Sequence, residues 1–112
     1  MASQSNVVVV LTTISTVEQA ERLARQLLEE RLIACSTVIE AAGSHYWWGG
    51  RITSETEAVL MIKTTTELIE PLKVRILELH PYQVPEFIVL EASAVTDAYA
   101  TWIEESTKSR EN

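Results

Sequence analysis

The chain contains a single cysteine, Cys35, so it can form no intrachain disulfide. This usage suits a reducing compartment, and a lone cysteine near the start of an apolar strand is typical of a small core residue. Glycine is also scarce, with three in 112 residues, and none belongs to a Gly-rich phosphate loop or a Gly-x-Ser-x-Gly element. The sequence therefore offers no catalytic residue to name, and we expect a protein that is not an enzyme.

A basic cluster is missing as well. Nine Lys and Arg residues against 16 Asp and Glu residues give a formal net charge of −7, so we expect neither a nucleic acid nor a membrane as partner. The first six residues lack the basic start and apolar core of a signal peptide. No apolar run approaches the roughly 20 residues that cross a bilayer. We expect a cytoplasmic protein.

The residue patterns predict one α+β domain over residues 1–112, with loose tails at 1–6 and 107–112. A continuous β-branched run, Val7–Leu11, indicates a central strand with apolar surroundings on both faces. Further strands are expected at 34–39, 45–48, 51–65 and 87–90, with a bend at Gly43-Ser44 and a hairpin turn at Gly49-Gly50. Helices are expected at 16–31, from 66 or 67 to 79, and from Thr96 or Asp97 onward.

The order of these elements predicts a ferredoxin-like split βαβ sandwich with a long hairpin and an extra C-terminal helix. In that architecture the first and third strands occupy the middle of the sheet. Both strands have apolar residues on both faces, as Val7–Leu11 and Ala58–Ile62 show. Sequence pattern and topology therefore agree.

Two helices can cover only one face of such a sheet. On the other face, each apolar side chain left in water would forgo roughly 1.5–3 kcal/mol, and an apolar surface of that size normally marks an interface. We therefore expect an obligate oligomer whose copies cover one another's sheets. The hairpin carrying Trp47 and Trp48 would reach a neighbour, and cyclic closure would remove open strand edges.

The segment His80–Glu86 is the best candidate binding site by residue type. Pro81 and Pro85 fix their own φ and restrict the residues before them, so we expect a stiff, extended connection. It carries an imidazole, a phenol, an amide and a carboxylate. The alternative is that His80 and Glu86 are ordinary residues at a helix end and a strand start, with Tyr82 packed between them.

Metal binding has limited support from spacing. His80 and Glu86 supply two ligands suited to Cu²⁺ or Zn²⁺, whereas the closely spaced ligand pairs of a structural zinc site are missing. Lys63 ends a strand that is apolar on both faces, and it becomes an anion-binding candidate if a cleft holds it.

Five motifs in order resemble the CutA divalent-cation tolerance proteins, over about Val7 to Ile103. The motifs are Ala34-Cys35, Ser44-x-Tyr46-x-Trp48-x-Gly50, Lys63-Thr64, His80-Pro81-Tyr82-x-x-Pro85-Glu86 and Tyr99-x-x-Trp102. The resemblance implies a very stable homotrimer with inter-subunit sheet contacts and a role in tolerance of copper and other divalent cations.

The resemblance also implies site residues. A cleft between subunits would be formed by Tyr46, Trp48, Lys63, Tyr82 and Glu86, and a metal would be held by His80 and Glu86. The family's copper ligands include a cysteine at the end of the first strand and two histidines before the Pro-Tyr. Thr12 and Leu79 stand at two of those positions, so Cu²⁺ or another divalent cation should be held weakly.

Two other functions use the same architecture. The first is a signalling trimer similar to PII-like proteins, in which Lys63 faces a small anionic metabolite and Trp48 or Tyr82 stacks on a ring. The second is an acyl-phosphate hydrolase, which requires an arginine in the loop after the first strand. Residues 12–16 contain no arginine, so the hydrolase ranks last.

Overall fold

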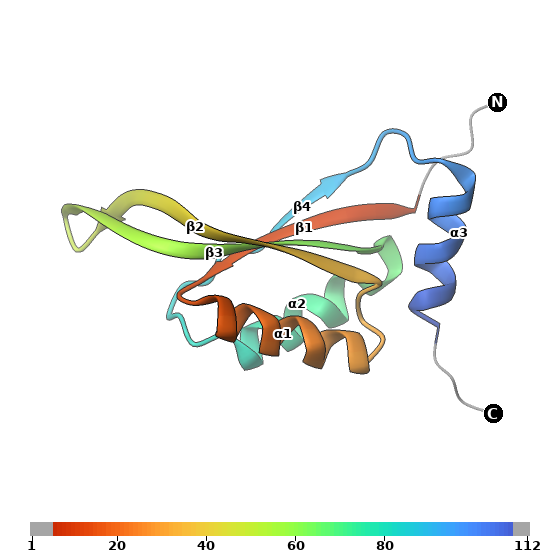
Figure 1. The fold of residues 1–112 in the computed structure, drawn as a ribbon, viewed down its shortest axis with the longest axis horizontal. Helices are drawn as coiled ribbons and strands as arrows, with labels where there is room; N and C mark the ends of the chain where they lie inside the picture. Colours follow the sequence, from red (N-terminus) through yellow and green to blue (C-terminus); the bar gives the residue numbers. More distant parts are fainter. Residues whose placement is uncertain (1–5, 109–112) are drawn as a thin grey trace.

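The structure is a computed structural model that describes residues 6–108 of the chain. It is an α+β fold of four antiparallel strands and three α-helices, with one short 3₁₀ turn (Figure 1). In chain order the elements are β1 (Val7–Ile14), α1 (Val17–Glu29), β2 (Cys35–Trp48), β3 (Arg51–Thr65), the 3₁₀ turn η1 (Thr66–Leu68), α2 (Ile69–Leu79), β4 (Ile88–Glu91) and α3 (Asp97–Ser106). Each helix of the described part is too short or too polar to span a bilayer.

The sheet has the order β2-β3-β1-β4, so β1 and β3 are central, as their sequences predicted. Residues alternate between the faces: Val8, Val10 and Ile62 are fully buried beneath the helices. Figure 1 shows α1 and α2 side by side on that face. The main core therefore lies between one face of the sheet and these two helices.

Helix α1 begins at Val17, within one residue of the predicted start, and Thr16 caps it. The Thr16 hydroxyl accepts the Gln19 N–H at 3.1 Å, and the Gln19 side chain accepts the Thr16 N–H at 3.2 Å. A stripe of buried residues then faces the sheet, consisting of Ala20, Leu23, Ala24 and Leu27. The helix ends at Glu29, two residues before the predicted end, because Arg31 adopts a left-handed φ of 61° that no helical residue has.

Two local predictions were wrong. The strand interruption expected at Gly43-Ser44 occurs between Ile39 and Ala42, where Ala41 has a φ of 56°, and β2 otherwise runs unbroken to Trp48. Cys35 is not a buried core residue: it is half-buried, and its Sγ lies 3.7 Å from Tyr99 Oη. Helix α3 begins at Asp97, as predicted, with Thr96 in the N-cap position but without a side-chain capping bond.

The chain ends only partly test the predicted tails, because residues 1–5 and 109–112 lie outside the described residues. Asn6 and Thr107 were assigned to the tails, but both make backbone hydrogen bonds. The Asn6 carbonyl accepts from Thr66 N at 2.8 Å, and Thr107 N donates to the Ile103 carbonyl at 3.2 Å.

Within residues 6–108, almost nothing covers the second face of the sheet. Helix α3 packs only across its end, where Ile103 joins Val7 and Ala34 in a small separate core (Figure 1). Beyond that end, Ile88 and Leu90 of β4 are 46% and 48% exposed. They pair with Leu11 and Val9 of β1, and cross-strand partners share a face. Ile39 of β2 pairs with Val59 and lies on the same face. We call this surface, formed by Val9, Leu11, Ile39, Val59, Met61, Ile88 and Leu90, the open face.

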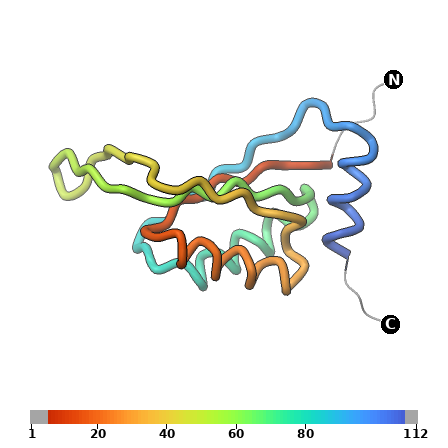
Figure 2. The backbone as a smooth tube through the Cα atoms, viewed as in Figure 1, coloured from red at the N-terminus to blue at the C-terminus, as the bar shows by residue number. Residues whose placement is uncertain are grey.

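The β2–β3 hairpin projects far past the two helices as a long arm (Figures 1 and 2). Its turn is the predicted Gly49-Gly50 pair, both residues having positive φ, which β-branched or bulky side chains resist. Near the tip, Trp47 and Ile52 are 71% and 69% exposed and stand opposite each other. The arm therefore presents apolar side chains to solvent.

Candidate functional site

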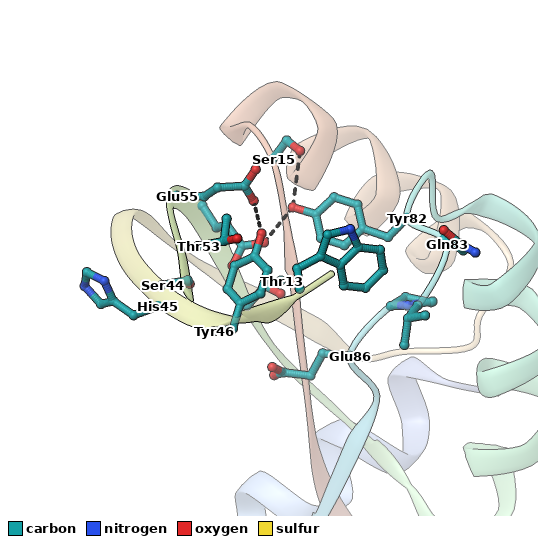
Figure 3. A pocket seen from close by; sticks show the side chains of 14 residues that line it. Thr13, Ser15, Ser44, His45, Tyr46, Thr53, Glu55, Tyr82, Gln83 and Glu86 are labelled. Carbon is teal, nitrogen blue, oxygen red and sulfur yellow. Dashed lines mark hydrogen bonds between the residues drawn. The ribbon is translucent and has the colours of Figure 1, made fainter. Parts of the chain in front are cut away.

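A pocket of about 700 Å³ lies where the arm leaves the sheet. Figure 3 shows its walls: the end of β1, the arm, and the segment that joins α2 to β4. Its lining residues are Thr13, Ser15, Ser44, His45, Tyr46, Trp48, Thr53, Glu55, Glu57, Tyr82, Gln83, Val84, Pro85 and Glu86. That volume is typical of a small-molecule site.

Sheet register places much of the pocket on the same side as the open face. Tyr46 pairs with Thr53 and Ser44 pairs with Glu55, so these side chains share a face of the arm. Glu57 follows Glu55 by two residues and precedes Val59 of the open face by two. The pocket therefore borders the open face, and any copy that covered that face would lie beside it.

Two phenols point at two carboxylates in the pocket. The Tyr82 hydroxyl donates to Glu57 Oε2 at 2.6 Å and accepts from Ser15 Oγ at 3.2 Å, and the Tyr46 hydroxyl donates to Glu55 Oε1 at 2.5 Å (Figure 3). Burial and the bond to Glu57 raise the pKa of Tyr82 to about 12. The bond to Glu55 raises the pKa of Tyr46 to about 12. Both phenols therefore remain protonated donors at neutral pH.

The pocket is acidic. It is lined by Glu55, Glu57 and Glu86, and no lysine or arginine is among its lining residues. Glu57 is only 6% exposed. The ion pairs found within residues 6–108 involve Lys73 or Arg75 and none of these three glutamates. A nearly buried carboxylate without a cationic partner carries a substantial desolvation cost.

The segment before β4 is stiff at its start and bent further on. His80 is extended, with φ −77° and ψ 134°, as the following proline requires. The chain then bends through Tyr82, Gln83 and Val84 instead of running straight, which corrects the expectation of a wholly extended connection. This bend turns Tyr82 toward β1 and β3, and its hydroxyl reaches both Ser15 and Glu57.

His80 is a structural residue in this geometry. It is 7% exposed. Its Nδ1 accepts the Tyr82 N–H at 3.1 Å, so Nε2 carries the hydrogen and donates to the Thr13 carbonyl at 2.7 Å. The ring also meets the edge of Tyr82, with centroids 4.6 Å apart. A cation could reach an imidazole nitrogen only if one of these bonds broke.

The predicted site residues divide into three groups. Tyr46, Trp48, Tyr82 and Glu86 come together in the pocket. Lys63 does not line it, and its Nζ instead donates to Thr37 Oγ1 at 3.0 Å. His80 forms the third group: it does not line the pocket, and its two ring nitrogens are bonded to Thr13 and Tyr82. His45, which was not predicted as a site residue, lies at the rim with its ring directed away from the other labelled side chains (Figure 3), 2.8 Å from Ser54 Oγ.

Sequence reasoning missed Glu55 and Glu57, which supply most of the pocket's charge. The available signal was their position in the return strand, at the same period-two spacing as Val59 and Met61. A carboxylate that shares a face with apolar strand residues is unusual and suggests a site. No group of three or more His, Cys, Asp or Glu residues within 6–108 converges closely enough to hold a metal ion.

The sequence is similar to a family of known proteins over most of its length. The family model described as CutA1 divalent ion tolerance protein matches residues 8–106. The divalent-cation tolerance protein CutA of Pyrococcus horikoshii is 43% identical over 101 residues, which cover 90% of this chain and 98% of that protein. The protein of the same name from Thermus thermophilus is 39% identical over 99 residues, covering 88% of this chain and 96% of that protein.

Solved structures give the same result. The crystal structure of CutA from Xylella fastidiosa superimposes with a TM-score of 0.90 at 36% sequence identity, covering 93% of this chain and all of that chain. Sequence and fold thus agree over nearly the whole length of the protein. The chain belongs to the CutA1 divalent ion tolerance protein family.

Proposed function

We propose that this chain works as a homotrimer that binds divalent cations in the acidic pocket, in keeping with the tolerance role for which its family is named. One observation carries the proposal: three carboxylates and neither a lysine nor an arginine line a pocket, and one of those carboxylates is nearly buried. A cation in the pocket would offset the cost of that buried charge.

The open face supports the oligomer. Ile39, Ile88 and Leu90 are each between 46% and 48% exposed, and covering them would contribute about 1 kcal/mol apiece. Leu11 and Met61 are half-buried beside them and would add to that sum. Trimeric closure would also protect the edges formed by β2 and β4. The order of strands and helices supports a ferredoxin-like split βαβ sandwich, and we propose that classification for the subunit.

The donors in the pocket favour particular ions. Carboxylate and phenol oxygens suit hard cations, which keep part of their hydration shell when few ligands converge. Cu²⁺ prefers imidazole or thiolate ligands. Both ring nitrogens of His80 are hydrogen bonded, and Cys35 lies on β2 outside the pocket lining. Within residues 6–108, His45 is the one imidazole in the lining, at the pocket rim, and its Nδ1 lies 2.8 Å from Ser54 Oγ. We therefore propose that the protein holds copper weakly. It stays a prediction that His80 and Glu86 are the copper ligands. The cytoplasmic location also stays a prediction.

The pocket gives less support to an anionic metabolite. Lys63, the cation expected to face it, is bonded to Thr37 instead. In one copy of the chain, an anion in this pocket would meet three carboxylates and be repelled.

Calorimetric titration of Mg²⁺, Mn²⁺ and Cu²⁺ into the full chain tests the proposal. Glu86→Gln should weaken binding, whereas Glu91→Gln, an exposed glutamate outside the pocket lining, should leave it unchanged and serves as the matched control. His80→Gln tests the copper ligand separately: an unchanged Cu²⁺ isotherm removes His80 from the site. If none of the three ions binds, or if Glu86→Gln and Glu91→Gln behave alike, the pocket is not a divalent-cation site.

A further inference from the structure

The pocket has an aromatic half that an inorganic ion would not use. Tyr46, Trp48 and Tyr82 all contribute to its lining, and Trp48 remains 52% exposed in the single chain. Figure 3 shows the rings of Tyr46 and Tyr82 on two sides of the site, held there by their bonds to carboxylates. Fixed ring faces next to negative charge attract a positively charged group that also has apolar surface.

The size of the pocket also favours an organic cation over an inorganic ion. Its volume of about 700 Å³ is far larger than one ion needs, and it lies in the range of sites that bind small organic molecules. No three carboxylate or imidazole groups within residues 6–108 converge as an inner coordination sphere requires. An ammonium group needs no such convergence, because it can donate to separate carboxylates in different directions.

Glu57 provides the observation that is independent of the pocket's shape. Its side chain lines the pocket although the residue is only 6% exposed. Its Oε2 accepts one hydrogen bond from Tyr82, and no Lys, Arg or His of the described chain forms an ion pair with it. A carboxylate in this position calls for a cationic donor from outside the chain.

We propose that the pocket binds an organic cation: an ammonium group on a short apolar stem, with the charge at Glu57 and Glu55 and the stem against Trp48 and Tyr82. Glu86, on the opposite wall, suits a second positive charge, so a short diamine fits better than a monoamine. The proposal uses the same pocket as the divalent-cation function but requires a different class of cation. The two can therefore fail separately.

The test is calorimetric titration of 1,4-diaminobutane into the full chain at low ionic strength, with 1-aminobutane, Mg²⁺ and succinate as comparison ligands. We expect the diamine to bind more tightly than the monoamine and succinate not to bind. Raising the salt concentration should weaken binding, because part of the attraction is between charges.

Substitutions at Trp48 and at the glutamates test the aromatic half and the acidic half of the pocket separately. Trp48→Leu should weaken diamine binding by about threefold to thirtyfold, the range of one cation–π contact, and should leave Mg²⁺ binding unchanged. Trp47→Leu is the matched control, because Trp47 is the adjacent arm residue and lies outside the lining. Glu57→Gln should weaken the diamine at least tenfold, and Glu86→Gln should reduce the preference for the diamine over the monoamine. Sedimentation of each variant establishes that its assembly is unchanged.

Several results would overturn this inference. They are no diamine binding in the native chain, equal loss in Trp48→Leu and Trp47→Leu, or diamine binding that survives Glu57→Gln. Mg²⁺ binding without diamine binding would refute the organic cation and leave the divalent-cation function standing. Diamine binding without Mg²⁺ binding would support the organic cation and count against the divalent-cation function.

Discussion

Replacing Tyr82 with phenylalanine removes one hydroxyl group and, with it, a hydrogen bond to a nearly buried carboxylate. In the native chain this hydroxyl donates to Glu57 at 2.6 Å, and Glu57 is 6% exposed. Hydrogen bonds to charged groups contribute about 1.5–3 kcal/mol, and water cannot fully replace the lost donor at a nearly buried carboxylate. Tyr82→Phe should therefore lower the free energy of unfolding by roughly that amount.

The chain contains its own control for this prediction. The Tyr46 hydroxyl donates to Glu55 at 2.5 Å, but Glu55 is exposed, so water can take the place of the phenol. Tyr46→Phe should therefore lower the free energy of unfolding much less than Tyr82→Phe does. The two variants make the same chemical change, and they differ mainly in the burial of the partner carboxylate.

Guanidinium unfolding followed by tryptophan fluorescence measures both costs. The subunit concentration must be held constant, because the proposed assembly would make the stability depend on concentration. The midpoint of Tyr82→Phe should fall by roughly 0.3–1 M relative to the native chain, and that of Tyr46→Phe should move much less. Equal shifts, or a neutral Tyr82→Phe, would refute the idea that Glu57 depends on this phenol.

Three further predictions concern the subunit fold. Thr12→Val should raise stability or leave it unchanged, because the Thr12 hydroxyl is buried and has no hydrogen-bond partner within residues 6–108. A loss of more than about 1 kcal/mol in thermal unfolding would contradict this. Thr16→Ala should cost about 1 kcal/mol by removing the helix cap to Gln19, measured by denaturation, and an unchanged midpoint would contradict it. The bond from Arg75, followed by that from Gln26, lowers the pKa of Glu30 below its ordinary 4.5, so this stabilisation is present above that pH and is lost as the pH falls through the lower folded-state value. The difference in melting temperature between the native chain and Glu30→Gln should therefore shrink below pH 4.5, and a constant difference would argue against the ion pair.

Much of the fold could be predicted because its patterns are local. The runs Val7–Leu11 and Ala58–Ile62 are apolar on both faces, and this identified the two central strands. The bulge was misplaced because Ala41 takes a positive φ that its residue type does not favour. By residue type, Gly43 was the expected position of the bulge. The pairing of β2 with β3 instead places the bulge between Ile39 and Ala42.

The pocket could be predicted only in part. Tyr82 and Glu86 lie close in sequence, and Tyr46 and Trp48 alternate on one strand, so their grouping needed only one long-range contact. Lys63 was grouped with them by motif, but it follows Glu57 by six residues along the same strand, roughly 20 Å at the rise of a β-strand. The role of His80 depends on Thr13 and on the bend after Pro81, neither of which spacing reveals.

Sedimentation equilibrium of the full chain, from micromolar to nanomolar subunit concentration, tests the central claim most directly. That claim is that copies of the chain cover the open face and so border the acidic pocket. It predicts the mass of three subunits throughout the micromolar range, with the loss of assembly accompanied by exposure of Trp47 and Trp48. A folded, soluble single subunit at micromolar concentration would contradict it.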